Sequence, residues 1–304
     1  MACASWERKS SREVRDGSME SLVASGRRTR VNQVSNCLAA HRCFASPARG
    51  PRMRKNDISL VDIPLALVLL TRLPLPRLSK GSFQRQSQAV WAFPLAGLAV
   101  TLPACLAAGC AMTLGLPEGL AAGLFILVQV LLTGAMHEDG LADCADGFWG
   151  GFDPARRLEI MKDSQIGSYG VLALIIGIGF RWQALLLLLE SGDLWAPLAL
   201  SLLSRAMMPV LMNGLPNARQ SGLSQSVGRP SRRAVILGLG LAVVLSLLLL
   251  GFVTFALVAA LALASLGVGL LARVKIGGQT GDVLGACQQV SEISGLFILV
   301  ALSS

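Results

Sequence analysis

Long apolar runs alternate with short polar connections along most of this chain. Seven of the runs are long enough, or nearly so, to cross a bilayer as a helix, which takes roughly 20 apolar residues. They lie at about 89–112, 119–136, 171–190, 194–212, 234–250, 252–272 and 286–303. An eighth run, at about 58–70, is too short and contains Asp62 and Pro64, so we expect a half-helix that helps to cover a site. The pattern predicts an all-α polytopic membrane bundle of about seven spanning helices plus a short N-terminal half-helix.

The composition is that of a membrane protein, and the positive net charge comes almost entirely from the N-terminal residues. Of the 304 residues, 53% are hydrophobic and 15% are charged, which is typical of a chain in a lipid bilayer. The net charge is +9, but residues 1–55 hold 12 Lys and Arg against 4 Asp and Glu, whereas the rest hold 15 against 14. The tail lacks the interleaved aromatic residues that stack on bases, so nucleic acid is not an expected partner.

The abrupt change of composition near Met53 predicts a two-part chain. We expect residues 1–55 to form a basic, disordered extension and residues 56–304 to form a membrane-embedded catalytic domain. The change also fits a mis-assigned start near Met53, in which case N-terminal sequencing of the native protein would find nothing before it.

The basic residues of the connections predict the orientation of the bundle. They fall in four groups, each separated from the next by two apolar runs: Arg72, Arg77, Lys80 and Arg85; Arg156, Arg157 and Lys162; Arg219, Arg229, Arg232 and Arg233; Arg273 and Lys275. The turns on the opposite side, near 113–118, 191–193 and 250–251, contain no Lys or Arg. By the positive-inside rule the basic side is cytoplasmic.

A polar segment at 137–170, on the basic side, interrupts the apolar pattern and is the candidate site. Asp139, Asp143 and Asp146 are spaced i, i+4, i+7, which places three carboxylates on one face of a helix continuing from the preceding span. Carboxylates beside hydrocarbon are costly unless a cation neutralises them, and Mg²⁺ or Mn²⁺ prefers such oxygen ligands. Gly140 and Gly147 would let a bulky substrate approach the backbone.

Basic residues and a fourth carboxylate follow in the same segment. Asp163 comes directly after Lys162 and close to Arg157, so one loop supplies metal ligands and phosphate-binding cations together. A solvated loop is the plain alternative. His137 could ligate metal or act as a base, although a lone His at a helix end is more often a hydrogen-bonding group that orients a ligand.

Three further features outside this segment bear on function. Asp282 follows the glycine-rich stretch 277–281, where backbone amides could approach phosphate, or where Asp282 could simply lie at a helix N-terminus. Arg181 and Arg205 lie within apolar runs, so we expect them to face the bundle interior or reach toward an edge. Arg205 could meet a substrate or pair with a carboxylate.

The motifs of this chain resemble those of the cobalamin synthase, or adenosylcobinamide-GDP ribazoletransferase, family. The resemblance rests on His137–Asp143, Ala145–Gly147, Arg157–Ser164 and Ile166–Gly167, with Leu70–Pro74 and Gly277–Ala286 near the two ends of the core. It covers about residues 57–303, and the first 52 residues depart from the family's usual short N-terminus.

The resemblance implies a Mg²⁺-dependent, multi-pass transferase of the bacterial inner membrane, with its active site on the cytoplasmic face. It would join adenosylcobinamide-GDP to α-ribazole, or to α-ribazole 5'-phosphate, giving adenosylcobalamin, or its 5'-phosphate, and GMP. This is the last step of the cobalamin nucleotide loop. The ribazole 3'-hydroxyl would attack the phosphorus on the cobinamide side, so catalysis would come mostly from positioning and charge neutralisation.

On that mechanism each candidate residue receives a role. The metal ligands would be Asp139, Asp143, Asp146 and Asp163. Lys162 and Arg157 would hold phosphate oxygens, and a carboxylate or His137 would take the hydroxyl proton. The residues assigned to substrate binding are Arg72, Arg157, Gly281 and Asp282.

Two other functions and one assembly state stay open at this point. Asp143–Gly147 overlaps the start of the CDP-alcohol phosphotransferase pattern, but Phe148–Gly151 then departs from it. A small-molecule transporter would show inverted repeats or acids midway across the membrane, whereas here the acids gather on one side. Small-residue faces could form homo-oligomers, although no single motif identifies one.

Overall fold

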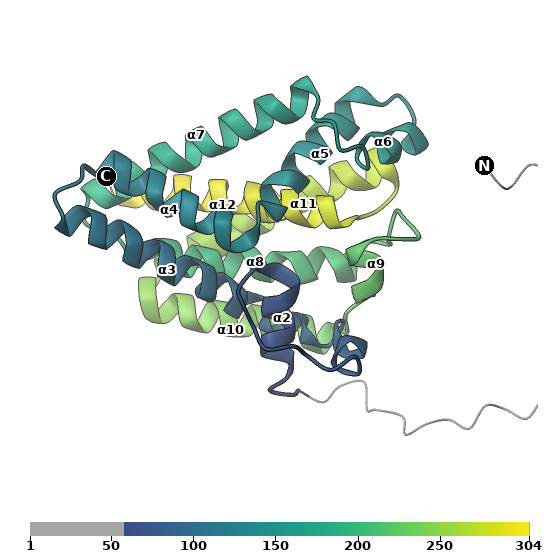
Figure 1. The fold of residues 1–304 in the computed structure, drawn as a ribbon, viewed down its shortest axis with the longest axis horizontal. Coiled ribbons are helices and arrows are strands. Elements are labelled where there is room, and N and C mark those ends of the chain that lie inside the picture. Colours follow the sequence, from purple (N-terminus) through teal and green to yellow (C-terminus); the bar gives the residue numbers. More distant parts are fainter. Residues whose placement is uncertain (1–57, 304) are drawn as a thin grey trace, which may run out of the picture. The chain divides into compact units, whose positions relative to one another are not determined.

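The computed structural model describes residues 58–303, which form helices and no strands (Figure 1). The predictions made for the tail, including a start near Met53, concern residues outside this range. The helices are α2 (Asp62–Leu70), η1 (Ser82–Arg85), η2 (Ala89–Ala92), α3 (Phe93–Thr113), α4 (Glu118–Thr133), α5 (Met136–Gly150), α6 (Pro154–Ile160), α7 (Ser168–Glu190), α8 (Ala196–Gly214), α9 (Leu223–Val227), α10 (Arg232–Leu250), α11 (Val253–Ile276) and α12 (Gly281–Ser303). The all-α class is confirmed.

Five helical segments of the described chain are long and apolar enough to cross a membrane. They are Ala89–Thr113, which joins η2 to α3, and the helices α7, α10, α11 and α12. The pair α4 and α5 passes the same test only when both are taken together. The protein is therefore a multi-pass membrane protein with five such segments, or six with the bent pair, and the prediction of about seven spans stays a prediction.

A sharp bend separates α4 from α5. The two helices differ in direction by 88°, because Gly134 and Ala135 both adopt left-handed backbone angles, with φ of 65° and 58°, and a right-handed helix cannot run through them. A side chain at 134 would also collide with Arg72, whose Nε lies 2.8 Å from the position of a Cβ. The prediction that the acidic helix continues from the preceding span is therefore wrong.

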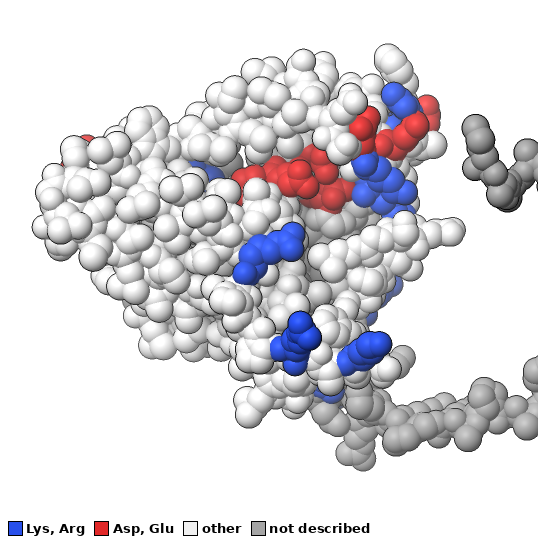
Figure 2. Space-filling model, viewed as in Figure 1, with Lys and Arg blue, Asp and Glu red and all other residues white. Residues whose placement is uncertain are grey.

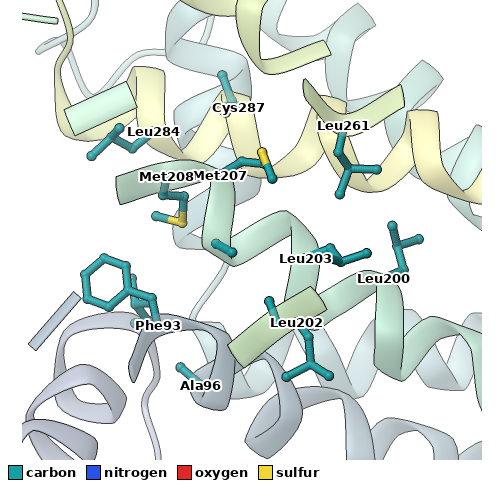
Figure 3. Close-up of a cluster of buried hydrophobic side chains, with 14 of the residues drawn as sticks. Phe93, Ala96, Leu200, Leu202, Leu203, Met207, Met208, Leu261, Leu284 and Cys287 are labelled. Atoms are coloured by element: carbon teal, nitrogen blue, oxygen red, sulfur yellow. The ribbon is translucent and has the colours of Figure 1, made fainter. Parts of the chain in front are cut away.

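Helix α8 lies inside the bundle and packs against α3, α10, α11 and α12. Figure 3 shows Leu202, Leu203 and Met208 of α8 between Phe93 of α3 and Leu261 of α11. Nearly all of its side chains are buried, including the polar Ser201 and Arg205. A helix that meets protein on every side can carry such residues, which explains why α8 is less apolar than the helices that face lipid.

Two glycines bring α12 against α5. A Cβ on Gly140 would lie 2.7 Å from the carbonyl oxygen of Asp282, and one on Gly285 would lie 3.2 Å from the carbonyl oxygen of Met136. Both distances are shorter than an ordinary contact, so the backbones touch only because these positions lack side chains. The expectation that Gly140 leaves room for a substrate is wrong, since α12 fills that space; Gly147 is likewise covered by Met161.

The short helix α2 is the predicted half-helix, fixed by a buried carboxylate. Asp62 accepts hydrogen bonds from Arg85 Nε at 2.8 Å, Trp91 Nε1 at 3.1 Å and the Ser59 amide at 3.0 Å. Burial alone would raise the pKa of Asp62, but these donors, Arg85 first, hold it below the usual value. The contacts join α2 to η1 and η2, and Leu69 and Leu70 of α2 then form part of the wall of a cavity next to the candidate site.

Candidate functional site

The candidate site lies where the polar helix α5 meets the first turn of α12. Figure 2 shows Asp and Glu gathered in one patch, with Lys and Arg beside it. Asp143 is half-buried and is acted on by the negative charges of Asp139, Asp282 and Asp146 and by the positive charge of Arg219. The sequence prediction that the carboxylates share a helix thus holds within α5, and α12 adds Asp282.

Arg219 is the cation built into this cluster. It comes from the connection between α8 and α9, and its Nη1 lies 2.9 Å from Asp282 Oδ2. Its Nη2 donates to the Leu158 carbonyl at 3.2 Å, and Asp282 also accepts from Thr280 Oγ1 at 3.2 Å. Sequence reasoning counted Arg219 among the basic residues of this side but gave it no role, because its partner is 63 residues away.

Asp146 and Asp163 lie in a different part of the segment. The two carboxylate oxygens of Asp146 accept the amides of Gly167 at 2.7 Å and Gly170 at 2.9 Å, so Asp146 caps the N-terminus of α7. Asp163 is exposed and accepts the Gln165 amide at 3.2 Å. Both line a second, open cavity of about 350 Å³. The four predicted metal ligands therefore form two pairs.

The predicted phosphate-binding cations differ in how far their donors are engaged. The Arg157 guanidinium donates to three carbonyls, those of Gly151 at 2.9 Å, Lys275 at 2.9 Å and Phe152 at 3.2 Å, and so fastens α6 to the end of α11. Lys162 is exposed just after α6. Arg72 is exposed beside the bend between α4 and α5, where its amide donates to the Leu132 carbonyl at 2.7 Å.

A small cavity opens next to Asp139 and Asp282. Its volume is about 210 Å³, and its walls come from α2, α3, α5, α8, α9, α12 and the adjoining loops. His137 is part of this wall, is 1% exposed, and its Nε2 has no hydrogen-bond partner among the described residues. Gly281, predicted to contact substrate, lines the same cavity.

A second set of charges is buried inside the bundle. Arg181 of α7 donates to Glu138 of α5 at 2.8 Å, to Glu292 of α12 at 3.2 Å and to Gln129 of α4 at 2.5 Å. Arg205 donates to Ser201 Oγ at 2.5 Å, while its Nε has no partner among residues 58–303. The expectation that Arg181 faces the interior is confirmed. Sequence reasoning assigned no role to Glu138 or Glu292.

The carboxylates suit a metal ion that completes its coordination with substrate. Within residues 58–303, no group of three or more His, Cys, Asp or Glu side chains is arranged to hold a metal ion. Mg²⁺, however, is commonly held through one or two carboxylates plus substrate phosphates. Asp139 and Asp143, one turn apart on α5, are the two carboxylates that could hold an ion in this way.

These features define a class: an all-α, multi-pass membrane protein whose carboxylate site lies at one end of the bundle beside a small cavity. The sequence model of the cobalamin-5-phosphate synthase family matches residues 62–300. The chain belongs to this family.

Curated relatives carry the name adenosylcobinamide-GDP ribazoletransferase. The protein of Mesorhizobium japonicum is 42% identical over 247 residues, 81% of this chain and 95% of the relative. The protein of Brucella canis is 41% identical over 263 residues, 82% of this chain and 99% of the relative. No solved structure is significantly similar.

Proposed function

We propose that this protein is an adenosylcobinamide-GDP ribazoletransferase, which joins adenosylcobinamide-GDP to α-ribazole or its 5'-phosphate and releases GMP. The observation that carries the proposal is the cluster of Asp139, Asp143 and Asp282 around a single Arg219 at the end of an apolar bundle. Such an excess of negative charge is suited to a cation that brings phosphates. Relatives whose alignments cover more than three quarters of this chain carry the name adenosylcobinamide-GDP ribazoletransferase.

The reaction exchanges a phosphoanhydride bond for a phosphoester bond. The ribose 3'-hydroxyl oxygen of ribazole forms a bond to the phosphorus on the cobinamide side, and the pyrophosphate bond to GMP breaks. The hydroxyl proton passes to a carboxylate of the cluster, or to His137, and then to solvent. Because phosphoryl transfer needs little covalent help from the protein, the residues act by positioning the two substrates and balancing charge.

In this proposal Asp139 and Asp143 hold Mg²⁺. When bound, the ion would neutralise negative charge on the pyrophosphate. Arg219 fixes Asp282 beside this pair, and the exposed cations Lys162 and Arg72 are available to phosphate oxygens arriving from solvent. Asp146 and Asp163, as a separate pair, offer a second position for an ion.

The site faces the cytoplasm of a bacterium in this proposal. The connections that carry Lys and Arg, including α6 and the segment around α9, lie at the same end of the bundle as the acidic patch (Figures 1 and 2). The positive-inside rule then assigns that end to the cytoplasm, the compartment that holds nucleotides. The membrane is the inner one.

GMP release by purified protein in detergent or lipid nanodiscs tests the proposal. Protein given adenosylcobinamide-GDP and α-ribazole should release GMP with Mg²⁺ and stop when EDTA is added. Asp143→Asn should slow release strongly, whereas Glu190→Gln, at an exposed carboxylate at the far end of α7, should not. Well-folded wild-type protein that releases no GMP would refute the proposal, and uptake of labelled cobinamide without GMP release would favour a transporter.

A further inference from the structure

The cavity beside Asp139 and Asp282 is too small for a macrocycle and has an apolar lining. Its volume of about 210 Å³ lies below the range of roughly 300–1,000 Å³ usual for drug-sized ligands. Phe93, Met208, Met212 and Leu284 line it and are buried. Figure 3 shows Phe93, Met208 and Leu284, from three different helices, at one end of the buried cluster. A space of this size and character fits one flat ring system.

Four polar side chains of the cavity wall, those of Asn217, Ser224, Gln225 and Gln279, are hydrogen-bonded to one another. Ser224 Oγ lies 2.6 Å from Gln279 Oε1 and 3.0 Å from Asn217 Oδ1, and Gln279 Nε2 also donates to Asn217. Asn217 Nδ2 donates in turn to Gln225 at 2.7 Å. These groups hold the loop before α9 against the start of α12, and little of their hydrogen-bonding capacity is left for a ligand.

Two buried polar atoms of the cavity wall, His137 Nε2 and Arg219 Nε, stand outside this network and have no partner among the described residues. Burying a ring nitrogen such as that of His137 without a hydrogen bond is costly. A neutral imidazole with its proton on Nε2 would donate a single hydrogen bond to a ligand in the cavity. The wall thus combines apolar faces with the unpartnered His137 Nε2 and Arg219 Nε and with the carboxylates of Asp139 and Asp282.

We propose that this cavity binds the aromatic base of the ribazole substrate. The inference rests on the proposed function. A benzimidazole ring is flat and mostly apolar, and its one nitrogen not bonded to the sugar accepts one hydrogen bond, which matches Met208, Met212 and His137. Thioether side chains pack well against aromatic rings. The corrin ring exceeds the cavity.

The position of the cavity gives the base a part in the reaction. Asp139 and Asp282 belong both to the cavity wall and to the carboxylate cluster. A base seated against Met208 therefore directs the attached ribose toward those carboxylates, where its hydroxyl must react. The cavity is in this way a positioning site for the attacking substrate rather than for the leaving nucleotide.

Two methionines on one helix provide the test. Met207 and Met208 are neighbours on α8 and are equally buried, but only Met208 lines the cavity. Met208→Thr should raise the KM for α-ribazole by about tenfold or more, the effect of losing apolar contacts in a pocket, and leave the KM for adenosylcobinamide-GDP nearly unchanged. Met207→Thr should change neither KM. Leu223→Asp, at the exposed rim on α9, repeats the test if Met208→Thr does not fold.

Each other outcome has a definite meaning. A rise in the KM for adenosylcobinamide-GDP alone would place the guanosine in the cavity and overturn the inference, and so would two unchanged KM values. Equilibrium binding of α-ribazole, followed by the fluorescence of its ring, separates the inference from the proposed function. Wild-type protein that binds α-ribazole more tightly than Met208→Thr protein but releases no GMP would refute the function alone.

Discussion

The acidic cluster at the end of the bundle and the ionic network inside it handle charge in opposite ways. In the network, Arg181 lies within 3.2 Å of both Glu138 and Glu292, and Arg205 lies close by. In the cluster, Asp139, Asp143 and Asp282 have Arg219 as their cation. The network is balanced and sealed, whereas the cluster is accessible and unbalanced. In an apolar protein the unbalanced set is the better candidate for the site, because a cation from solvent is needed to neutralise it.

The largest expected effect comes from breaking the balanced set. Arg181→Met should destabilise the fold by about 3–5 kcal/mol, because it leaves buried carboxylates without their counter-charge. Thermal unfolding in detergent measures this loss. The double variant Arg181→Met, Glu138→Gln, which leaves the buried Arg205 balanced by Glu292, should recover much of it. An unchanged unfolding temperature for Arg181→Met alone would mean that the network contributes little to stability.

Removing one charge from the unbalanced set should have a different consequence. Asp143→Asn should reduce the rate of GMP release by roughly 10²-fold or more, the loss typical of removing one charge-stabilising group. Its unfolding temperature should stay the same or rise, since like charges repel in the cluster. Rates and melting curves of the same preparation measure both. A rate near that of wild type would remove Asp143 from the chemistry.

Displacing the start of α12 should weaken the cluster more than the network, because Asp282 lies in the first turn of α12 and Glu292 lies further along it. The Cβ of Gly140→Ala would lie 2.7 Å from the Asp282 carbonyl oxygen, which belongs to the backbone and cannot turn aside. Overpacking of this kind costs about 1–3 kcal/mol, and moving Asp282 should also slow GMP release. Gly179→Ala, on α7, where nothing lies within 4 Å of the new Cβ, is the matched control. Equal behaviour of the two variants would contradict the close crossing.

The smallest effect concerns a pair outside the spanning helices. The pKa of Asp62 is lowered in the folded protein, by Arg85 and Trp91 against the opposing effect of burial. The stability from these contacts should therefore be present above the ordinary aspartate pKa of 3.8 and lost as pH falls through the lower, folded value. Melting curves of wild type and Asp62→Asn should converge toward acid pH. Parallel curves would show that the pair does not titrate with unfolding.

The sequence predicts the apolar helices well because bilayer thickness sets their length. It cannot predict the break between α4 and α5 as readily, since Gly134 is compatible with a helix in a membrane and Ala135 is a strong helix former. In the folded chain Ala135 nevertheless has a φ of 58°, which its own side chain disfavours. The spacing of the carboxylates on α5 is a local pattern and can be read from the sequence, whereas the break depends on residues that are distant in the chain.

The sequence also does not predict which charged side chains contact each other. The spacing of Asp146 predicts a metal ligand. Its two hydrogen bonds from the amides of Gly167 and Gly170 could not be predicted, because they depend on where α7 begins. Arg219 meets Asp282 only after α8 and α12 have packed. Spacing along one helix identifies candidates, but which candidates face each other is decided by helices far apart in the chain.

The bend after α4 has a consequence for the lipid around it. α4 has 16 residues and so measures about 24 Å at the usual rise of a helix, less than the roughly 30 Å of a bilayer's hydrocarbon. A segment that ends early draws the headgroups and water inward to meet it. The membrane should be locally thin beside α5, so bilayers of different acyl-chain length offer a way to tune access to the carboxylates without altering a single residue.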